Sequence, residues 1–132
     1  MKKIFTFATF LIIIISGISK SHSIEADVFV QSTVNRAAKT LGGNLSKQER
    51  IEKLKDIARD TVDVNGIGFY SLGAHRKNLT EDQLDKYKKV FAEYFLKSFS
   101  SRLAEYSNPE IEVDSKRVIN KNYTIVSSTL VS

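Results

Sequence analysis

The stretch from Thr80 to Tyr106 constrains the fold most, because it combines a helix start, a long periodic pattern and a stop. Thr80 and Gln83 form a capping-box pattern, in which two side chains satisfy free N–H groups of a first helical turn. Asn108-Pro109 ends the pattern, since proline disfavours helical geometry at the residue before it. Mostly apolar residues recur between these signals at helical spacing, which gathers them on one face: Leu84, Tyr87, Phe91, Tyr94, Phe95, Ser98, Phe99 and Leu103. The stretch predicts a helix of roughly 35–40 Å at about 1.5 Å per residue.

Five aromatic residues lie between Tyr87 and Phe99, which is many for a single helix. Two interpretations fit this density. The helix is either a core helix with bulky side chains or one wall of an apolar cavity, and the periodicity alone does not separate the two.

Residues 1–23 predict an export signal peptide. Lys2 and Lys3 give a positive start, an apolar run follows, and Ser21-His22-Ser23 offers a small-residue cleavage pattern. The apolar run is shorter than the about 20 residues that a membrane-spanning helix needs. We therefore expect residues 24–132 to form one mature domain in the periplasm.

Composition excludes several chemistries for that domain. The chain has no cysteine, which excludes disulfides and thiolate chemistry. It has 20 basic and 15 acidic residues, but three of the lysines belong to residues 1–23, so the remainder is nearly balanced. No basic run is long enough to predict nucleic-acid binding.

Three further helices are expected before the aromatic one. The first covers residues 24–41, with Asp27 as its N-cap and a glycine pair after it. The second begins at a capping box formed by Ser46 and Glu49 and runs to about Val62.

The third helix is short and contains two glycines. Asp63 is its expected cap, and Gly73 closes it. Gly66 and Gly68 each weaken a helix by roughly 1 kcal/mol relative to alanine. We expect them to be tolerated because another backbone approaches closely there.

After Pro109 the pattern changes from helical spacing to alternation. Ile111 and Val113 alternate with acids, and β-prone residues continue to Val131 around a possible turn at Lys121-Asn122. Four helices followed by one or two strands predict an α+β fold. The last strand has no later partner, so either another molecule completes the sheet or the chain is a shortened form of a longer protein.

No pattern for catalysis or metal binding is present. His22 and His75 are too few for a metal site, and Gly66-Ile67-Gly68 lacks the context of a phosphate-binding loop. No Gly-x-Ser-x-Gly elbow accompanies the serines. We expect a protein that is not an enzyme and needs no cofactor.

An ordered set of short motifs resembles the MlaC family of periplasmic phospholipid-binding proteins, also described as toluene-tolerance auxiliary proteins. The motifs are Val62-Asp63-Val64, Phe69-Tyr70-Ser71-Leu72-Gly73, Thr80–Gln83, Phe91-Ala92-Glu93-Tyr94-Phe95, and Ser101-Arg102-Leu103 up to Tyr106. They cover about 45 residues, and the exported start and the alternating strand extend the similarity over most of the mature chain.

The resemblance implies helices packed on a mixed sheet of the nuclear-transport-factor-like type, with a deep apolar pocket between them for acyl chains. It also implies that the domain continues beyond Val131, so this chain would lack C-terminal strands and a helix. The candidates for the pocket wall are Phe69, Tyr70, Leu72, Phe91, Tyr94, Phe95 and Phe99.

The function implied by the resemblance is phospholipid transport between the outer and inner membranes, which maintains outer-membrane lipid asymmetry. The implied partners are phospholipid, an inner-membrane ABC transporter and an outer-membrane lipoprotein complex. Truncation would impair this activity. The alternative is an exported helical interaction module that pairs through its unfinished C-terminal strand.

Overall fold

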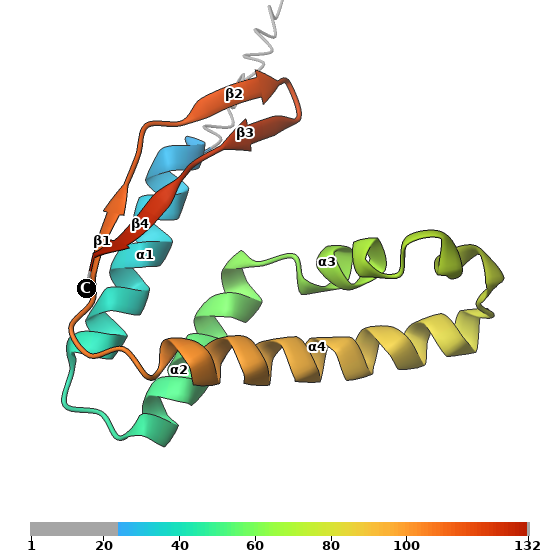
Figure 1. Ribbon diagram of the computed structural model, residues 1–132, viewed down its shortest axis with the longest axis horizontal. Helices are drawn as coiled ribbons and strands as arrows, with labels where there is room; N and C mark the ends of the chain where they lie inside the picture. Colours follow the sequence, from blue (N-terminus) through green and yellow to red (C-terminus); the bar gives the residue numbers. More distant parts are fainter. Residues whose placement is uncertain (1–23, 132) are drawn as a thin grey trace, which may run out of the picture.

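The computed structural model describes residues 24–131, and the predicted signal peptide lies outside them. Within these residues the fold is α+β, as predicted (Figure 1). The elements in chain order are α1 (Ala26–Gly42), α2 (Lys47–Thr61), α3 (Val64–Ser71), the 3-10 helix η1 (Gly73–Asn78), α4 (Glu81–Leu103), β1 (Glu110–Val113), β2 (Arg117–Asn120), β3 (Tyr123–Ile125) and β4 (Ser128–Val131). None of the helices described is long and apolar enough to cross a bilayer.

Both predicted capping boxes are confirmed. At the start of α2, the Ser46 N–H donates to the Glu49 carboxylate at 2.8 Å, and the Glu49 N–H donates to the Ser46 hydroxyl at 3.3 Å. At the start of α4, Thr80 and Gln83 make the same reciprocal pair at 3.0 and 3.3 Å. Each box satisfies two N–H groups that the helix itself leaves without a partner.

The predicted N-cap of α1 was wrong. Glu25 occupies the cap position without a side-chain cap bond, and Asp27 lies in the first turn, where its carboxylate accepts from the Val28 N–H at 3.0 Å. An acid in a first turn still favours the helix, because it faces the positive end of the helix dipole. The cap of α3 is confirmed: the Gly66 N–H donates to Asp63 at 2.9 Å.

The close approach expected at the α3 glycines comes from a side chain and not from a backbone. Gly68 is buried, and a methyl group there would lie 2.6 Å from the Phe91 ring of α4. The missing side chain therefore makes room for an aromatic ring.

At the other end of α4 the helix stops at Leu103, three residues before the predicted Tyr106, and Asn108 adopts a left-handed φ of 50°.

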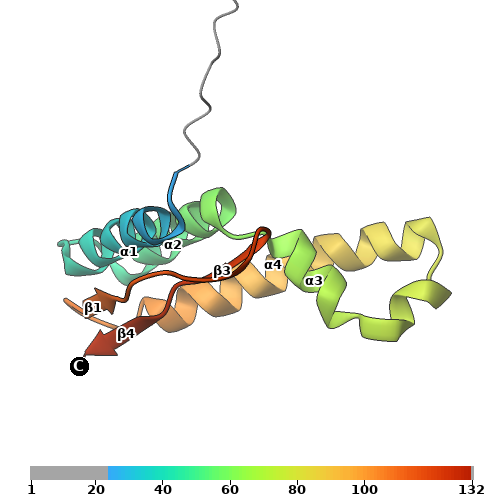
Figure 2. The same cartoon turned by 90° about the horizontal axis from the view of Figure 1, so that it is seen from above.

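The helices form two connected regions. In the first, α2 crosses the C-terminal half of α4 and α1 packs against α2, as Figures 1 and 2 show. We call this region the junction, and its buried core is Leu41, Leu54, Ile57 and Ala104. In the second, α3 and η1 lie along the N-terminal half of α4, and we call this region the distal arm. A smaller cluster of Ala58, Val64 and Leu96 joins the two.

The buried face of α4 differs from the face that the sequence periodicity predicts. Its buried residues are Leu96 and Ser100, neither of which belongs to the predicted face, whereas Tyr94 and Ser98, which do belong to it, are exposed. Ala104, just after α4, is buried with Leu54 and Ile57 of α2, so a small side chain lies where the two helices meet.

The strands form one long antiparallel hairpin, residues Glu110–Val131, which we call the ribbon. The prediction of one or two strands was wrong: β1 pairs with β4 and β2 pairs with β3, and the predicted turn at Lys121-Asn122 closes the hairpin. The Asp114 N–H donates to the Ser127 carbonyl at 2.9 Å and links the two pairs.

The ribbon bears on two expectations about the sheet. The last strand, β4, pairs with the earlier strand β1, and within residues 24–131 its other edge has no partner. Within residues 24–131 the sheet consists of antiparallel pairs, which is consistent with an incomplete form of the sheet that the resemblance implies. The ribbon runs beside α1, with the β2–β3 turn near the start of that helix (Figure 1).

Candidate ligand cavity

An apolar cavity of about 310 Å³ lies where the junction meets the ribbon. Its walls come from α1, α2, the last turns of α4 and the paired strands β1 and β4. Most of the lining side chains are aliphatic or aromatic: Val34, Ala37, Leu41, Leu54, Ile57, Ala58, Val62, Phe99, Leu103, Ile111 and Leu130, with Thr33, Thr61 and Ser128 as the polar members.

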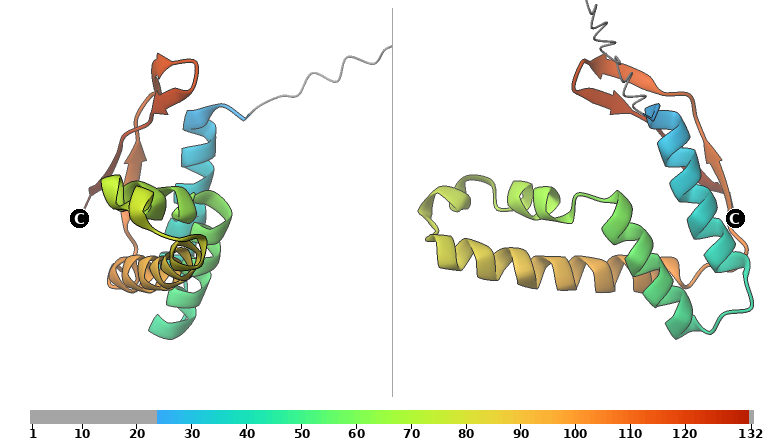
Figure 3. Two further views of the ribbon diagram at one scale, coloured as in Figure 1. Left: turned by 90° about the vertical axis from the view of Figure 1, so that its right-hand side faces the viewer. Right: turned by 180° about the vertical axis from the view of Figure 1, so that it is seen from behind.

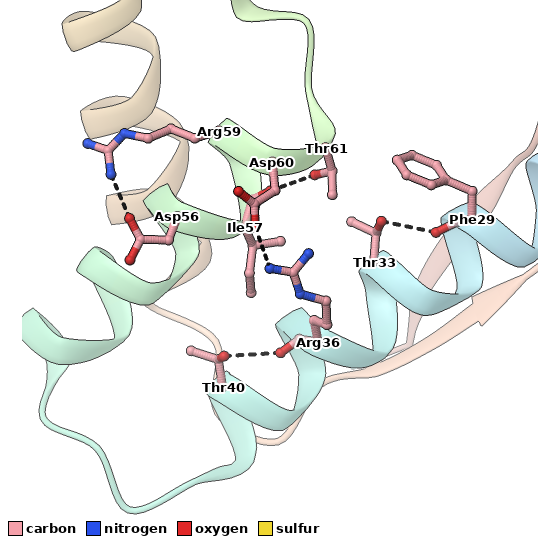
Figure 4. Close-up of polar contacts among 9 residues, drawn as sticks. All are labelled: Phe29, Thr33, Arg36, Thr40, Asp56, Ile57, Arg59, Asp60 and Thr61. Atoms are coloured by element: carbon pink, nitrogen blue, oxygen red, sulfur yellow. Dashed lines mark hydrogen bonds and ion pairs between the residues drawn. The ribbon is translucent and has the colours of Figure 1, made fainter. Parts of the chain in front are cut away.

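The two threonines add no unsatisfied hydroxyl to the wall. Thr33 donates to the Phe29 carbonyl at 3.0 Å, and Thr61 donates to the Ile57 carbonyl at 2.7 Å, as Figure 4 shows. Each hydroxyl is thus bonded within its own helix. An apolar guest entering this space would leave no threonine donor unpaired, whereas a polar guest would lose its hydration without a matching partner.

The cavity is open on the side between α4 and the ribbon. Phe99 and Leu130 line it there, and each keeps about two-fifths of its surface exposed. Leu130 lies directly opposite Ile111 in the β1–β4 register, so one cross-strand pair supplies this wall. A guest could therefore be held by the junction while part of it remains outside.

Ion pairs connect the helices around the cavity without entering its wall. Arg36 of α1 donates to Asp60 of α2 at 2.8 Å and joins these two helices, whereas Arg59 donates to Asp56 at 2.7 Å within α2 (Figure 4). Lys47 at the start of α2 donates to Glu105 beyond α4 at 2.5 Å and lowers the pKa of that carboxyl. These pairs are exposed, so they position the helices more than they stabilise them.

Phe99 is the one residue of the seven predicted from sequence that lines this cavity. Three more aromatic rings extend from it along α4, one helical turn apart. Tyr87, Phe91, Phe95 and Phe99 stack in series, with ring centroids 5.7, 6.0 and 5.5 Å apart. We call this set the aromatic ladder, and it leads from the cavity toward the distal arm.

Of the four predicted residues outside the ladder, Phe69, Tyr70 and Leu72 lie in the distal arm, and Tyr94 is exposed on α4. Phe69 carries the Arg76 guanidinium 5.0 Å from its ring centroid, and Leu72 is half-buried after α3. Tyr70 and Tyr94 are 83% and 69% exposed, so neither belongs to an enclosed wall in this structure. Their part in ligand binding stays a prediction.

The sequence reasoning missed the α1 and α2 walls, including Val34, Ala37, Leu54 and Ile57. The signal was present, because these residues form the apolar faces of two successive capped helices. This apolar periodicity predicts helix packing, because periodicity does not distinguish a packed helix face from a cavity wall.

No metal centre accompanies the cavity in the part of the chain that the structure describes. Residues 24–131 contain no group of three or more His, Cys, Asp or Glu side chains that could hold a metal ion. His75 is exposed in η1, in the distal arm.

The fold and the cavity define a small α+β protein with an apolar binding space. The family model described as "MlaC protein" matches residues 30–132, and the chain therefore belongs to the MlaC family. The intermembrane phospholipid transport system binding protein MlaC of Haemophilus influenzae is 25% identical over 129 residues, which cover 92% of this chain and 60% of that protein. The chain thus spans about three-fifths of the length of this curated relative. No solved structure matches this chain.

Proposed function

We propose that this chain is a non-enzymatic phospholipid carrier of the periplasm. The observation that supports the proposal most is the apolar cavity, whose threonine hydroxyls are satisfied and whose open side faces solvent. Membership of the MlaC family and the name of the Haemophilus influenzae relative point to the same ligand class. The partners would be an inner-membrane ABC transporter and an outer-membrane lipoprotein complex.

The physical task of such a carrier is to hide hydrocarbon from water. Each exposed methylene costs about 0.8 kcal/mol, so one acyl chain in water costs on the order of 10 kcal/mol. The cavity volume of about 310 Å³ is at the lower end of the roughly 300–1,000 Å³ typical of ligand sites. It would hold part of a lipid, and the aromatic ladder beside Phe99 would cover a further stretch of acyl chain.

The proposed site therefore has a centre and an extension. The centre is the cavity wall around Phe99, Leu103 and the Ile111–Leu130 pair. The extension is formed by Phe95 and Phe91 on the ladder. The head group would remain in solvent, which agrees with the absence of an ionisable side chain among the cavity-lining residues that the structure describes.

The test is to purify the exported chain and measure bound phospholipid by extraction and mass spectrometry. Ala37 lines the cavity, so Ala37→Phe would fill it, and Ala74→Phe makes the same change at an exposed position in η1. We expect Ala37→Phe to lower bound lipid at least about tenfold and Ala74→Phe to leave it unchanged. Circular dichroism establishes that both variants fold. A folded wild-type chain without lipid, or equal lipid in the two variants, would contradict the proposal.

The free edges of the ribbon favour a second candidate function, an interaction module. In residues 24–131 each strand of the ribbon pairs on one side only, which leaves backbone groups available for another strand. This candidate predicts a concentration-dependent dimer that carries no lipid. Light scattering on the purified chain, before and after lipid extraction, measures whether its mass rises with concentration and so separates this candidate from the carrier.

A further inference from the structure

The far end of the ribbon exposes a dense set of apolar side chains. We call residues Arg117–Ile125, which comprise β2, β3 and their turn, the hairpin tip. Every residue of the two strands is exposed, and Val118, Ile119 and Tyr123 keep more than half of their surface in solvent. Both faces of this hairpin are thus uncovered in the described structure, which is unusual for residues of this kind.

The charged side chains of the hairpin tip itself are all basic. Between Ser115 and Val131 the chain carries Lys116, Arg117 and Lys121 and no aspartate or glutamate. Lys116 pairs with Glu25 and Asp27 at the start of α1, so it anchors the base of the hairpin. Arg117 and Lys121 remain on the tip, beside the exposed apolar side chains.

The tip is shaped before any partner arrives. The Asn120 side-chain oxygen accepts from the N–H groups of Asn122 and Tyr123 at 2.8 and 3.1 Å, which closes the turn. A preformed turn loses little conformational entropy on binding. Figure 3 shows that the hairpin lies beside the start of α1 and projects away from α4.

We propose that the hairpin tip docks on the surface of an anionic lipid bilayer. Aliphatic side chains and a tyrosine beside cations match the bilayer interface, where apolar groups enter the acyl boundary and cations meet phosphate. The tip carries two cations and no acid, so its charge is complementary to that of an anionic leaflet.

The docking site goes beyond the carrier function and links to it through the ribbon. The same two chain segments that form the tip continue into β1 and β4, whose Ile111–Leu130 pair lines the cavity. Docking would therefore place the membrane contact and the cavity wall on one continuous element. Vesicle binding is measured without reference to bound lipid, so the two proposals fail independently.

The first experiment places a fluorophore at the tip. The chain has no tryptophan, so Tyr123→Trp introduces a single indole there, and Tyr70→Trp introduces one on the distal arm. Both tyrosines are highly exposed, at 68% and 83%, which makes them matched sites. With vesicles of phosphatidylglycerol and phosphatidylcholine, we expect a blue shift and quenching by brominated lipid for Tyr123→Trp alone.

The second experiment removes the tip's charge. Near an anionic leaflet each cation is worth about 1 kcal/mol, which corresponds to roughly fivefold in partitioning. Arg117→Gln with Lys121→Gln should therefore lower sedimentation with these vesicles by roughly 25-fold. Lys86→Gln with Lys89→Gln removes the same charge from exposed positions on α4 and should change it little.

Either experiment can overturn the proposal. An indole at position 123 that is unshifted by anionic vesicles, or one that shifts no more than the indole at position 70, removes the docking site. Equal vesicle binding by the two double variants does the same. In those cases the hairpin tip is a surface for a protein partner, and the membrane assignment is wrong.

Discussion

The junction and the ribbon are held together by different forces. Every buried apolar side chain in residues 24–131 belongs to a helix or to a residue capping one: Leu41, Leu54, Ile57, Ala58, Val64, Leu96 and Ala104. The ribbon contributes none, although it is rich in valine, isoleucine and leucine. The junction is therefore stabilised by burial, and the ribbon by backbone hydrogen bonds and its contact with α1.

This difference indicates which region depends on a partner. A two-stranded hairpin is marginal by itself, so the ribbon needs either more sheet or something bound against its apolar side chains. A guest in the cavity would touch Ile111 and Leu130 and so stabilise the ribbon through binding. The junction has its own core and would gain less.

The strongest test of the comparison removes the same leucine side chain from each region. Leu54 is 2% exposed in the junction and Leu130 is 38% exposed on β4. We expect Leu54→Ala to lower the free energy of unfolding by about 3 kcal/mol, as buried leucines do, and Leu130→Ala to lower it by less than about 1 kcal/mol. Urea unfolding measures both. Equal losses would mean that the ribbon is as tightly packed as the junction.

A second, smaller effect extends the comparison to the distal arm. Gly68→Ala would force the Phe91 ring to move, which costs about 1–2 kcal/mol even after the gain in helix propensity. Gly43→Ala is the matched control, because Gly43 has φ −83° and a methyl group there meets its nearest atom at 3.5 Å. Thermal unfolding should show a lower Tm for the first variant only. A stabilised Gly68→Ala would show that α3 is loosely packed on α4.

The smallest effect concerns the start of α2 and depends on pH. Hydrogen bonds from the Ser46 side chain and backbone lower the pKa of Glu49. A lowered folded-state pKa stabilises the protein above the unfolded pKa, and this contribution is lost as pH falls through the folded value. Ser46→Ala should cost about 1 kcal/mol at neutral pH and less in acid. A Tm difference between the two proteins that stays constant from neutral pH to about pH 2 would contradict this.

The parts of the fold that sequence predicted are those that depend on neighbouring residues. Both capping boxes and the Asp63 cap were predictable, because each cap and its partner are three residues apart. The Lys121-Asn122 turn was predictable for the same reason. The pairing of β1 with β4 was not, because it joins segments separated by the whole β2–β3 hairpin.

The candidate site was predicted less well than the fold. Aromatic density on α4 selected Phe99, which lines the cavity, and Tyr94, which the structure exposes, and the part of either in ligand binding stays a prediction. The buried positions at the C-terminal end of α4 are instead the small residues Ser100 and, just after the helix, Ala104, which packs with Leu54 and Ile57 of α2. A pattern that weighs only large apolar side chains cannot detect such a contact.

The irregular step between Val118 and Asn120 has a consequence for the distant cavity. It adds one residue to β2 that has no counterpart on β3, and a second one-residue step follows between the Arg117–Ile125 and Val113–Ser128 pairs, so the register down to Ile111 and Leu130 depends on both. With both steps retained, deleting Ile119 would shift β1 by one position along β4 and turn the opposite face of β1 toward α1, while β4 keeps its own orientation. Both chain neighbours of Ile111 are glutamates, so a glutamate would then take the place of Ile111 opposite Leu130. The number of residues in β2 near the turn thus determines whether β1 presents an aliphatic or an acidic side chain to the cavity.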